Sequence, residues 1–172
     1  MTLKNFLFFF LLILASVFFQ STALNILVIS GIKPDLVLIV VCYISLRWEE
    51  EVGTCLGFLL GFLQDVLSVG ILGLNALTKT LFGFICKKAE RRLNTKNPIV
   101  QMLLIFIFSL LEGIFFLLLL DAFHLHRGIH ETILELVLPQ ALYNMLLTPV
   151  LFWIINVLHR KWIFEDDRTN AG

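Results

Sequence analysis

One long apolar segment of this chain constrains its fold more than any other feature. It extends from Pro98 to Leu120 and contains one charged residue, Glu112. About 20 predominantly apolar residues are enough for a helix to cross the hydrocarbon core of a bilayer. A second long apolar segment runs from about Ile133 to Leu158. These two segments predict an all-α integral membrane protein, because a helix pairs its backbone polar groups internally in lipid.

The composition also favours a membrane location. Hydrophobic residues make up 59% of the 172 residues and charged residues 15%, whereas a soluble domain has about 25% charged residues. The mean hydropathy is +0.93. The formal net charge is zero, so the chain has no overall attraction to nucleic acid. We predict a lipid bilayer as its surroundings and no nucleic-acid partner.

The apolar segments predict one domain, a bundle of six transmembrane helices over residues 1–160, with a short cytoplasmic tail at 161–172. The second, third and fourth segments are short for spanning helices, so they require local thinning of the bilayer or help from flanking residues. The predicted spans are about 6–29, 34–48, 52–69, 71–86, 98–121 and 132–158.

The basic residues predict how the bundle is oriented. If all six segments span, ten of the 13 Lys and Arg residues fall on one side of the membrane. Lys33 and Arg127 fall on the other side, and Lys79 lies within the fourth span. Loops that face the cytoplasm are enriched in Lys and Arg. Both termini are therefore predicted to lie in the cytoplasm.

An alternative interpretation concerns the N-terminal segment. Residues 1–25 combine a basic start, an apolar run and the small residues Ser21, Thr22 and Ala23, which is also typical of a signal peptide. Its removal would leave five spans. The long apolar continuation favours a helix that is retained.

Gly53, Gly57 and Gly61 recur at every fourth position of the third predicted span. On a helix this spacing places the three glycines on one face, where the missing side chains allow another helix to approach closely. We expect this glycine stripe either to pack against a neighbouring helix of the bundle or to bind a partner. Self-association through the stripe is a further interpretation.

Among the charged residues of the predicted spans, we single out Asp65, Lys79 and Glu112. A charge at the centre of a bilayer costs about 3 kcal/mol on insertion scales, so such groups are expected to pair or to face a cavity. At a rise of 1.5 Å per residue, Lys79 and Glu112 lie at similar depths below the outer surface. We predict that Lys79 pairs with Glu112, with Asp65, or with both.

Amide side chains belong to the same half of the predicted bundle, among them Asn75 and Asn144. Together with the charged residues they predict a buried polar cluster that opens toward the outer leaflet. Four roles remain open for this cluster: a structural ion pair, a pocket for a small ligand or lipid headgroup, a proton or ion path, and a contact for a partner helix.

The sequence gives no positive argument for catalysis, a metal or a cofactor. Cys42, Cys55 and Cys86 lie in apolar runs without a Cys-x-x-Cys spacing. His126 and His130 are four residues apart but lack the His-Glu-x-x-His pattern of zinc hydrolases. We therefore predict a protein that is not an enzyme, with no catalytic residues, no metal site and no cofactor.

Three stretches of the chain resemble the bacterial rod shape-determining family MreD. They are "KPDLVLIVVCYISLRW", "GTCLGFLLGFLQDVLSVGILGLNAL" and "LPQALYNMLLTPVLFWIINVL", and the resemblance covers residues 30 to 158. The family pattern has a Pro-Asp start to the second helix, a G-x-x-x-G-x-x-x-D run with a following G-x-x-G turn, and a Pro and a Tyr-Asn pair in the last helix. The matching residues of the last two elements are Gly57, Gly61, Asp65, Gly70, Gly73, Pro139, Tyr143 and Asn144.

This resemblance implies a non-enzymatic scaffold of the cell-elongation machinery in the bacterial inner membrane. Members of the family work with the single-span protein MreC. They link cytoplasmic MreB filaments to the glycosyltransferase and transpeptidase that build peptidoglycan in the wall.

The MreD fold is also similar to the substrate-binding membrane subunit of energy-coupling-factor transporters. That similarity implies an alternative function, the binding of a vitamin or another small molecule. Such subunits use small residues on the first helix for coupling, whereas the first segment here, "FLFFFLLILASVFF", is bulky. The scaffold interpretation is therefore the favoured one.

Overall fold

A computed structural model describes residues 31–67, 72–122 and 132–169, together with scattered positions before them: Phe8, Leu11, Leu12, Ala15, Ser16, Phe18, Phe19, Gln20 and Val28. Within these residues the protein is all-α. The elements are α2 (Leu36–Arg47), α3 (Glu50–Leu67), α4 (Leu74–Glu90), α5 (Pro98–Ala122), the π-helical turn η2 (Ile133–Val137) and α7 (Leu138–Thr169).

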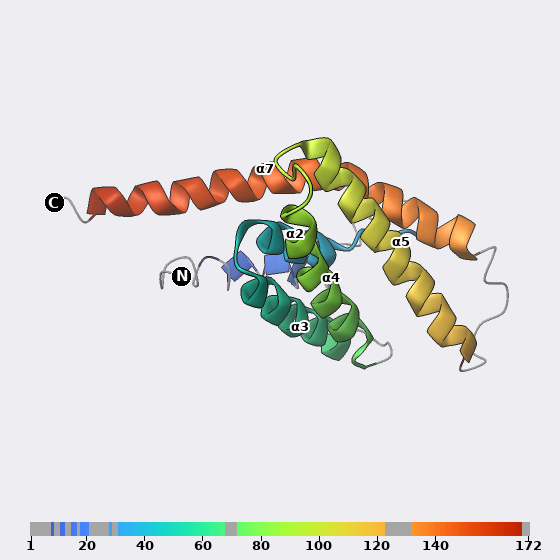
Figure 1. Cartoon of the computed structure of the whole chain (residues 1–172). Coiled ribbons are helices and arrows are strands. Elements are labelled where there is room, and N and C mark those ends of the chain that lie inside the picture. Colours follow the sequence, from blue (N-terminus) through green and yellow to red (C-terminus); the bar gives the residue numbers. More distant parts are fainter. Residues whose placement is uncertain are drawn as a thin grey trace.

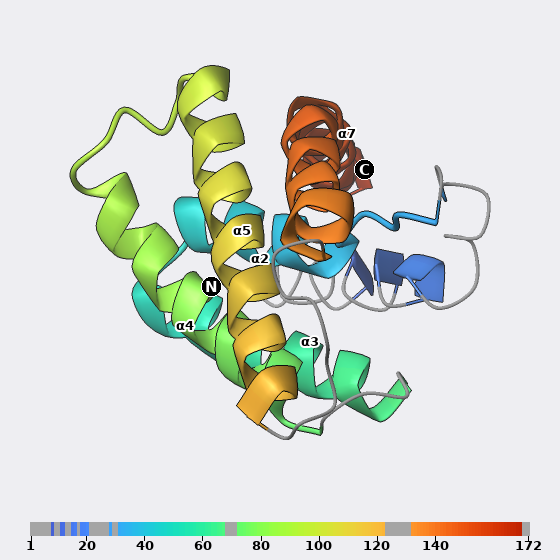
Figure 2. The same cartoon turned by 90° about the vertical axis from the view of Figure 1, so that its right-hand side faces the viewer.

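The helices form two pairs around a central short helix. α3 and α4 lie side by side, as do α5 and α7, and α2 contacts all four of them (Figures 1 and 2). The C-terminal half of α7 extends beyond the other helices (Figure 1). α7 continues through most of the predicted cytoplasmic tail at 161–172, to Thr169.

α2 is the core of the fold. All ten residues from Val37 to Leu46 are buried, and a helix that is apolar on every side is stable only when other helices enclose it. Its start is fixed by Asp35, whose Oδ1 accepts a hydrogen bond of 2.9 Å from the N–H of Leu38. This side-chain cap satisfies a backbone donor that the first turn leaves unpaired.

Two helices are long and apolar enough to cross a membrane by length and composition, Pro98–Leu118 and Ile133–Trp162, and α2 is a shorter apolar helix. The outer faces of the other helices are apolar as well. On α3, Phe58, Leu59 and Phe62 are all exposed. Large exposed apolar surfaces of this kind are typical of contact with lipid or a partner.

The predicted first span at 6–29 lies largely outside the described residues. Two of its described residues, Phe8 and Gln20, lie near opposite ends of α2. The ring of Phe8 lies 5.0 Å from that of His159, whose ring in turn lies 5.6 Å from that of Trp48, just after α2. The amide of Gln20 accepts a hydrogen bond of 3.0 Å from the N–H of Leu36, at the start of α2.

Candidate functional site

Lys79 is the centre of a buried polar network. Its Nζ lies 2.7 Å from Glu112 Oε1 on α5, 3.0 Å from Asp35 Oδ2 before α2 and 3.0 Å from Asn75 Oδ1 on α4. The side chain has no exposed surface. An ammonium has three N–H donors, so these three oxygens satisfy the group completely.

Asp35 is the member of this network that the sequence analysis did not assign. Its Oδ1 caps α2, while its Oδ2 binds Lys79. In the sequence, the Pro34-Asp35 pair indicated only the start of the second helix. Asp35 forms an ion pair with Lys79, which lies 44 positions later in the chain. This contact depends on how α2 and α4 pack, so no local sequence pattern predicts it.

Asp65 caps the N-terminus of α4, whereas one of the predicted alternatives made it a direct partner of Lys79. Its carboxylate accepts backbone hydrogen bonds from Gly73 at 2.9 Å, Asn75 at 3.2 Å and Ala76 at 3.0 Å. These are the unpaired donors at the N-terminus of α4, where the helix dipole favours negative charge. Gly73 itself has a φ of 95°, a left-handed conformation that glycine adopts without strain.

Asn75 links Asp65 to Lys79. Its Nδ2 donates to Asp65 Oδ1 at 2.9 Å, and its Oδ1 accepts from Lys79. Asp65 and Lys79 thus interact through the amide of Asn75. The two residues lie in the same polar cluster, as predicted. Of the predicted pairings of Lys79, the one with Glu112 is observed.

Asn144 extends the network to α7. Its Oδ1 accepts a hydrogen bond of 2.8 Å from the N–H of Asp35, and its Nδ2 donates to Ser109 Oγ on α5 at 2.8 Å. Asn144 is 1% exposed. The network therefore connects α3, α4, α5 and α7 to the start of α2. Breaking a buried ion pair by removing one partner costs about 3–5 kcal/mol.

The glycine stripe lies inside the bundle. A Cβ added to Gly57 would overlap the backbone carbonyl of Lys79, and one added to Gly61 would overlap that of Asn75. A Cβ on Gly53 would overlap the side chain of Ser45 on α2. The stripe thus lets α3 approach the backbone of α4 at the two residues that hold the polar network.

A cavity of about 380 Å³, called here the polar cavity, adjoins the network. Its wall includes most of the network's polar side chains and several apolar side chains of α4, α5 and η2. The wall residues that matter below are Lys33, Asp35, Gln64, Leu74, Asn75, Glu112, Phe116, Leu117, Leu136, Val137 and Asn144. Part of the wall is the π-helical turn η2, a conformation often found at functional sites.

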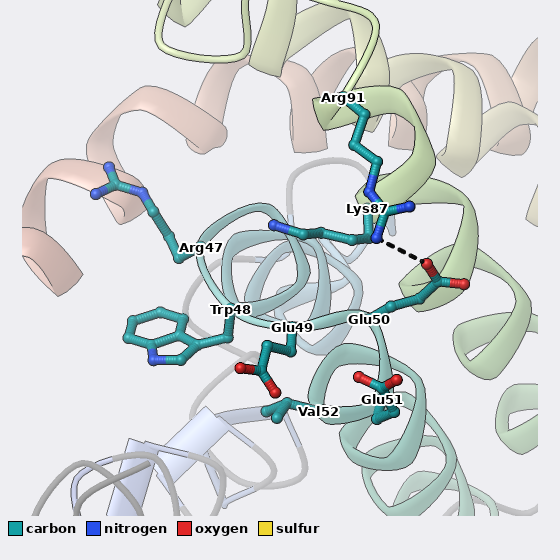
Figure 3. A pocket seen from close by; sticks show the side chains of 8 residues that line it. All are labelled: Arg47, Trp48, Glu49, Glu50, Glu51, Val52, Lys87 and Arg91. Carbon is teal, nitrogen blue, oxygen red and sulfur yellow. Dashed lines mark ion pairs between the residues drawn. The ribbon is translucent and has the colours of Figure 1, made fainter.

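A second cavity of about 420 Å³, called here the charged pocket, lies at the opposite ends of α2, α3 and α4 (Figure 3). Its lining includes Arg47, Glu50, Lys87 and Arg91. An ion pair of 3.4 Å joins Arg91 Nη2 to Glu50 Oε2 (Figure 3). The guanidinium side chain is 64% exposed, so this pair contributes about 1 kcal/mol or less. The pocket gathers basic residues from two predicted cytoplasmic loops.

Within the described ranges, His, Cys, Asp and Glu side chains form no group of three that could hold a metal ion. The site's titratable groups are instead paired with one another or with backbone donors. Such an arrangement fixes helices relative to one another and shapes a cavity. It defines the class of the protein: a helical protein with long apolar helices, organised around a buried ion-pair network.

The comparison with protein families identifies that class more closely. The family model of the rod shape-determining protein MreD matches residues 1–162. The chain belongs to the MreD family. This is a membrane protein family with a role in rod cell shape, alongside the MreB and MreC shape machinery, and it is a structural component rather than a known enzyme family. Neither the comparison with curated proteins nor that with solved structures found a match.

Proposed function

We propose that the protein is a non-enzymatic scaffold of the cell-elongation machinery in the bacterial inner membrane. It binds MreC directly and, through that complex, links MreB filaments to the peptidoglycan glycosyltransferase and transpeptidase. The family match over residues 1–162 carries this proposal. The buried network supports it, because a scaffold needs helices held in one arrangement.

The proposed topology has six spans with both termini in the cytoplasm. The charged pocket supports this orientation, since Arg47, Lys87 and Arg91 meet at one end of the bundle (Figure 3). Lys33 lies on the wall of the polar cavity, at the other end. Positive charge concentrated at one end is typical of the cytoplasmic side.

The proposed docking surface for MreC is a lipid-facing face of the bundle. The glycine stripe is occupied by α4 and α2, so it is not free to receive a partner helix. The exposed faces remain, such as the one on α3 that carries Phe58 and Phe62, whose rings are stacked with centroids 6.2 Å apart. Aromatic side chains are favoured at such contacts.

A pull-down tests this proposal. The tagged protein is extracted from its native membrane in a mild detergent, and the proteins bound to it are identified by mass spectrometry. We expect MreC together with wall-synthesis enzymes. A matched pull-down with an unrelated multi-span protein of equal abundance removes non-specific membrane proteins. Recovery of neither MreC nor a wall synthase would contradict the scaffold proposal.

The polar cavity favours one alternative function, that of a substrate-binding subunit of a vitamin or small-molecule transporter. Its volume of about 380 Å³ lies in the range of small-ligand sites, about 300–1,000 Å³. The same pull-down distinguishes the two functions, because a transporter subunit would bring down ATPases and a bound small molecule in place of the wall synthases.

A further inference from the structure

The wall of the polar cavity presents anionic groups while their cationic partner lies behind them. Asp35 and Glu112 line the cavity, and Lys79, which binds both, is fully buried. Two carboxylates therefore share one buried ammonium, while the other cation of this wall, Lys33, is exposed. A cationic group entering the cavity beside Asp35 and Glu112 would be attracted by these carboxylates.

Glu112 has capacity for another donor. Within the described residues, the hydrogen bonds to its carboxylate from Lys79 and Thr78 both end on Oε1. The side chain keeps 17% of its surface exposed. A carboxylate has about four acceptor positions on its two oxygens, so Oε2 can accept from a bound molecule.

Gln64 adds an acceptor that the described part of the chain leaves unsatisfied. It lines the cavity, and its Oε1 is buried without a hydrogen-bond partner among the described residues. A buried amide oxygen without a donor is unfavourable. A donor bound in the cavity would remove that cost once the amide turns Oε1 toward it.

The remaining wall of the cavity is suited to the apolar part of an amphiphile. Leu74, Leu117 and Val137 are buried wall residues, while Phe116 on α5 and Leu136 on η2 are 38% and 49% exposed. The apolar wall thus continues onto the outer, lipid-facing surface of two helices. An acyl chain can follow this surface while a headgroup occupies the polar wall.

We propose that the polar cavity binds the headgroup of a phospholipid that carries a primary ammonium, such as phosphatidylethanolamine. The ammonium faces Glu112 and Gln64, and the phosphate lies toward Lys33, an exposed cation on the same wall. A primary ammonium supplies three N–H donors, whereas the quaternary ammonium of phosphatidylcholine supplies none.

Native mass spectrometry of the detergent-purified full-length protein tests this assignment. The probes are phosphatidylethanolamine, phosphatidylcholine and phosphatidylglycerol with identical acyl chains, each titrated separately. We expect phosphatidylethanolamine to bind at least about tenfold more tightly than the other two, because hydrogen bonds to a charged group are worth about 1.5–3 kcal/mol each. Equal binding of the three lipids would overturn the proposal.

Two variants locate the binding. Glu112→Gln should weaken phosphatidylethanolamine binding roughly tenfold, and Gln64→Leu roughly five- to tenfold. Gln64→Leu removes no internal hydrogen bond of the described Oε1 atom, so it keeps the test valid if Glu112→Gln does not fold. Glu50→Gln, in the charged pocket, is the matched control and should bind the lipid as the wild type does.

Soluble ethanolamine phosphate tests whether the cavity binds a lipid or a free, soluble headgroup. If the lipid is the ligand, this compound competes only at concentrations far above that of the lipid, because it lacks the acyl contribution of about 0.8 kcal/mol per buried CH₂. Binding as tight as that of the lipid would assign the cavity to a soluble zwitterion instead. Unchanged lipid affinity in both Gln64→Leu and every folded Glu112→Gln preparation would also overturn the proposal.

Discussion

Lys79 Nζ and Glu112 Oε1 lie 2.7 Å apart between α4 and α5, and Lys79 is wholly buried. This pair, with Asp35 as its third charged member, holds together segments separated by more than 70 residues of sequence. The predictions below separate its contribution from that of the surface charges and the glycine stripe.

Lys79→Met should destabilise the bundle by about 3–5 kcal/mol, because it leaves Asp35 and Glu112 as neighbouring buried carboxylates without a cation. The measurement is the thermal unfolding midpoint in detergent. Arg91→Gln is the control, since it removes an exposed ion pair and should change stability by about 1 kcal/mol or less. Equal midpoints for Lys79→Met and wild type would show that the network does not stabilise the fold.

Gly57→Ala should lower the unfolding midpoint, because the new Cβ overlaps the carbonyl of Lys79 and forces α3 away from α4. Overpacking of this kind costs about 1–3 kcal/mol. Cys55→Ala on the exposed side of α3 is the matched control. A different result, loss of MreC from the pull-down with an unchanged midpoint, would make the stripe a partner surface.

Asp65→Asn should cost about 1–3 kcal/mol, because an amide places N–H donors against the backbone donors of Gly73 and Ala76. Asp121→Asn, at an exposed position of α5, should leave the unfolding midpoint unchanged. If Asp65→Asn and Asp121→Asn have the same unfolding midpoint, the cap on α4 does not stabilise the fold.

The proposed orientation predicts which cysteine variants react with a membrane-impermeant maleimide in intact cells. Lys33→Cys, near the polar cavity, should be labelled from outside the inner membrane. Arg91→Cys, in the charged pocket, should be labelled only after permeabilisation. The reverse pattern would place both termini outside the cytoplasm.

The sequence predicts much of this fold because the signals are local. Apolar runs and their charged ends placed α3, α5 and the start of η2 within about two residues of their observed bounds. The predicted sixth span ends at 158, whereas the helix continues to Thr169, since a polar composition does not prevent a helix from continuing.

The site was harder to predict because its contacts join distant segments. Depth alone brought Lys79 and Glu112 together, but it could not distinguish Asp65 from Asp35 as the second carboxylate. Gly73 decides that question, since its left-handed turn directs the backbone donors of α4 at Asp65. The carboxylate is then satisfied without the ammonium.

The hydrogen bond from the N–H of Asp35 to Asn144 joins residues 109 positions apart. During synthesis, the start of α2 therefore waits for its partner until most of the protein has left the ribosome. A helix of 12 residues is also too short to be secured by lipid alone. A nascent chain that ends before α7 therefore has an unfinished core, and we expect it to be degraded faster than the full-length chain.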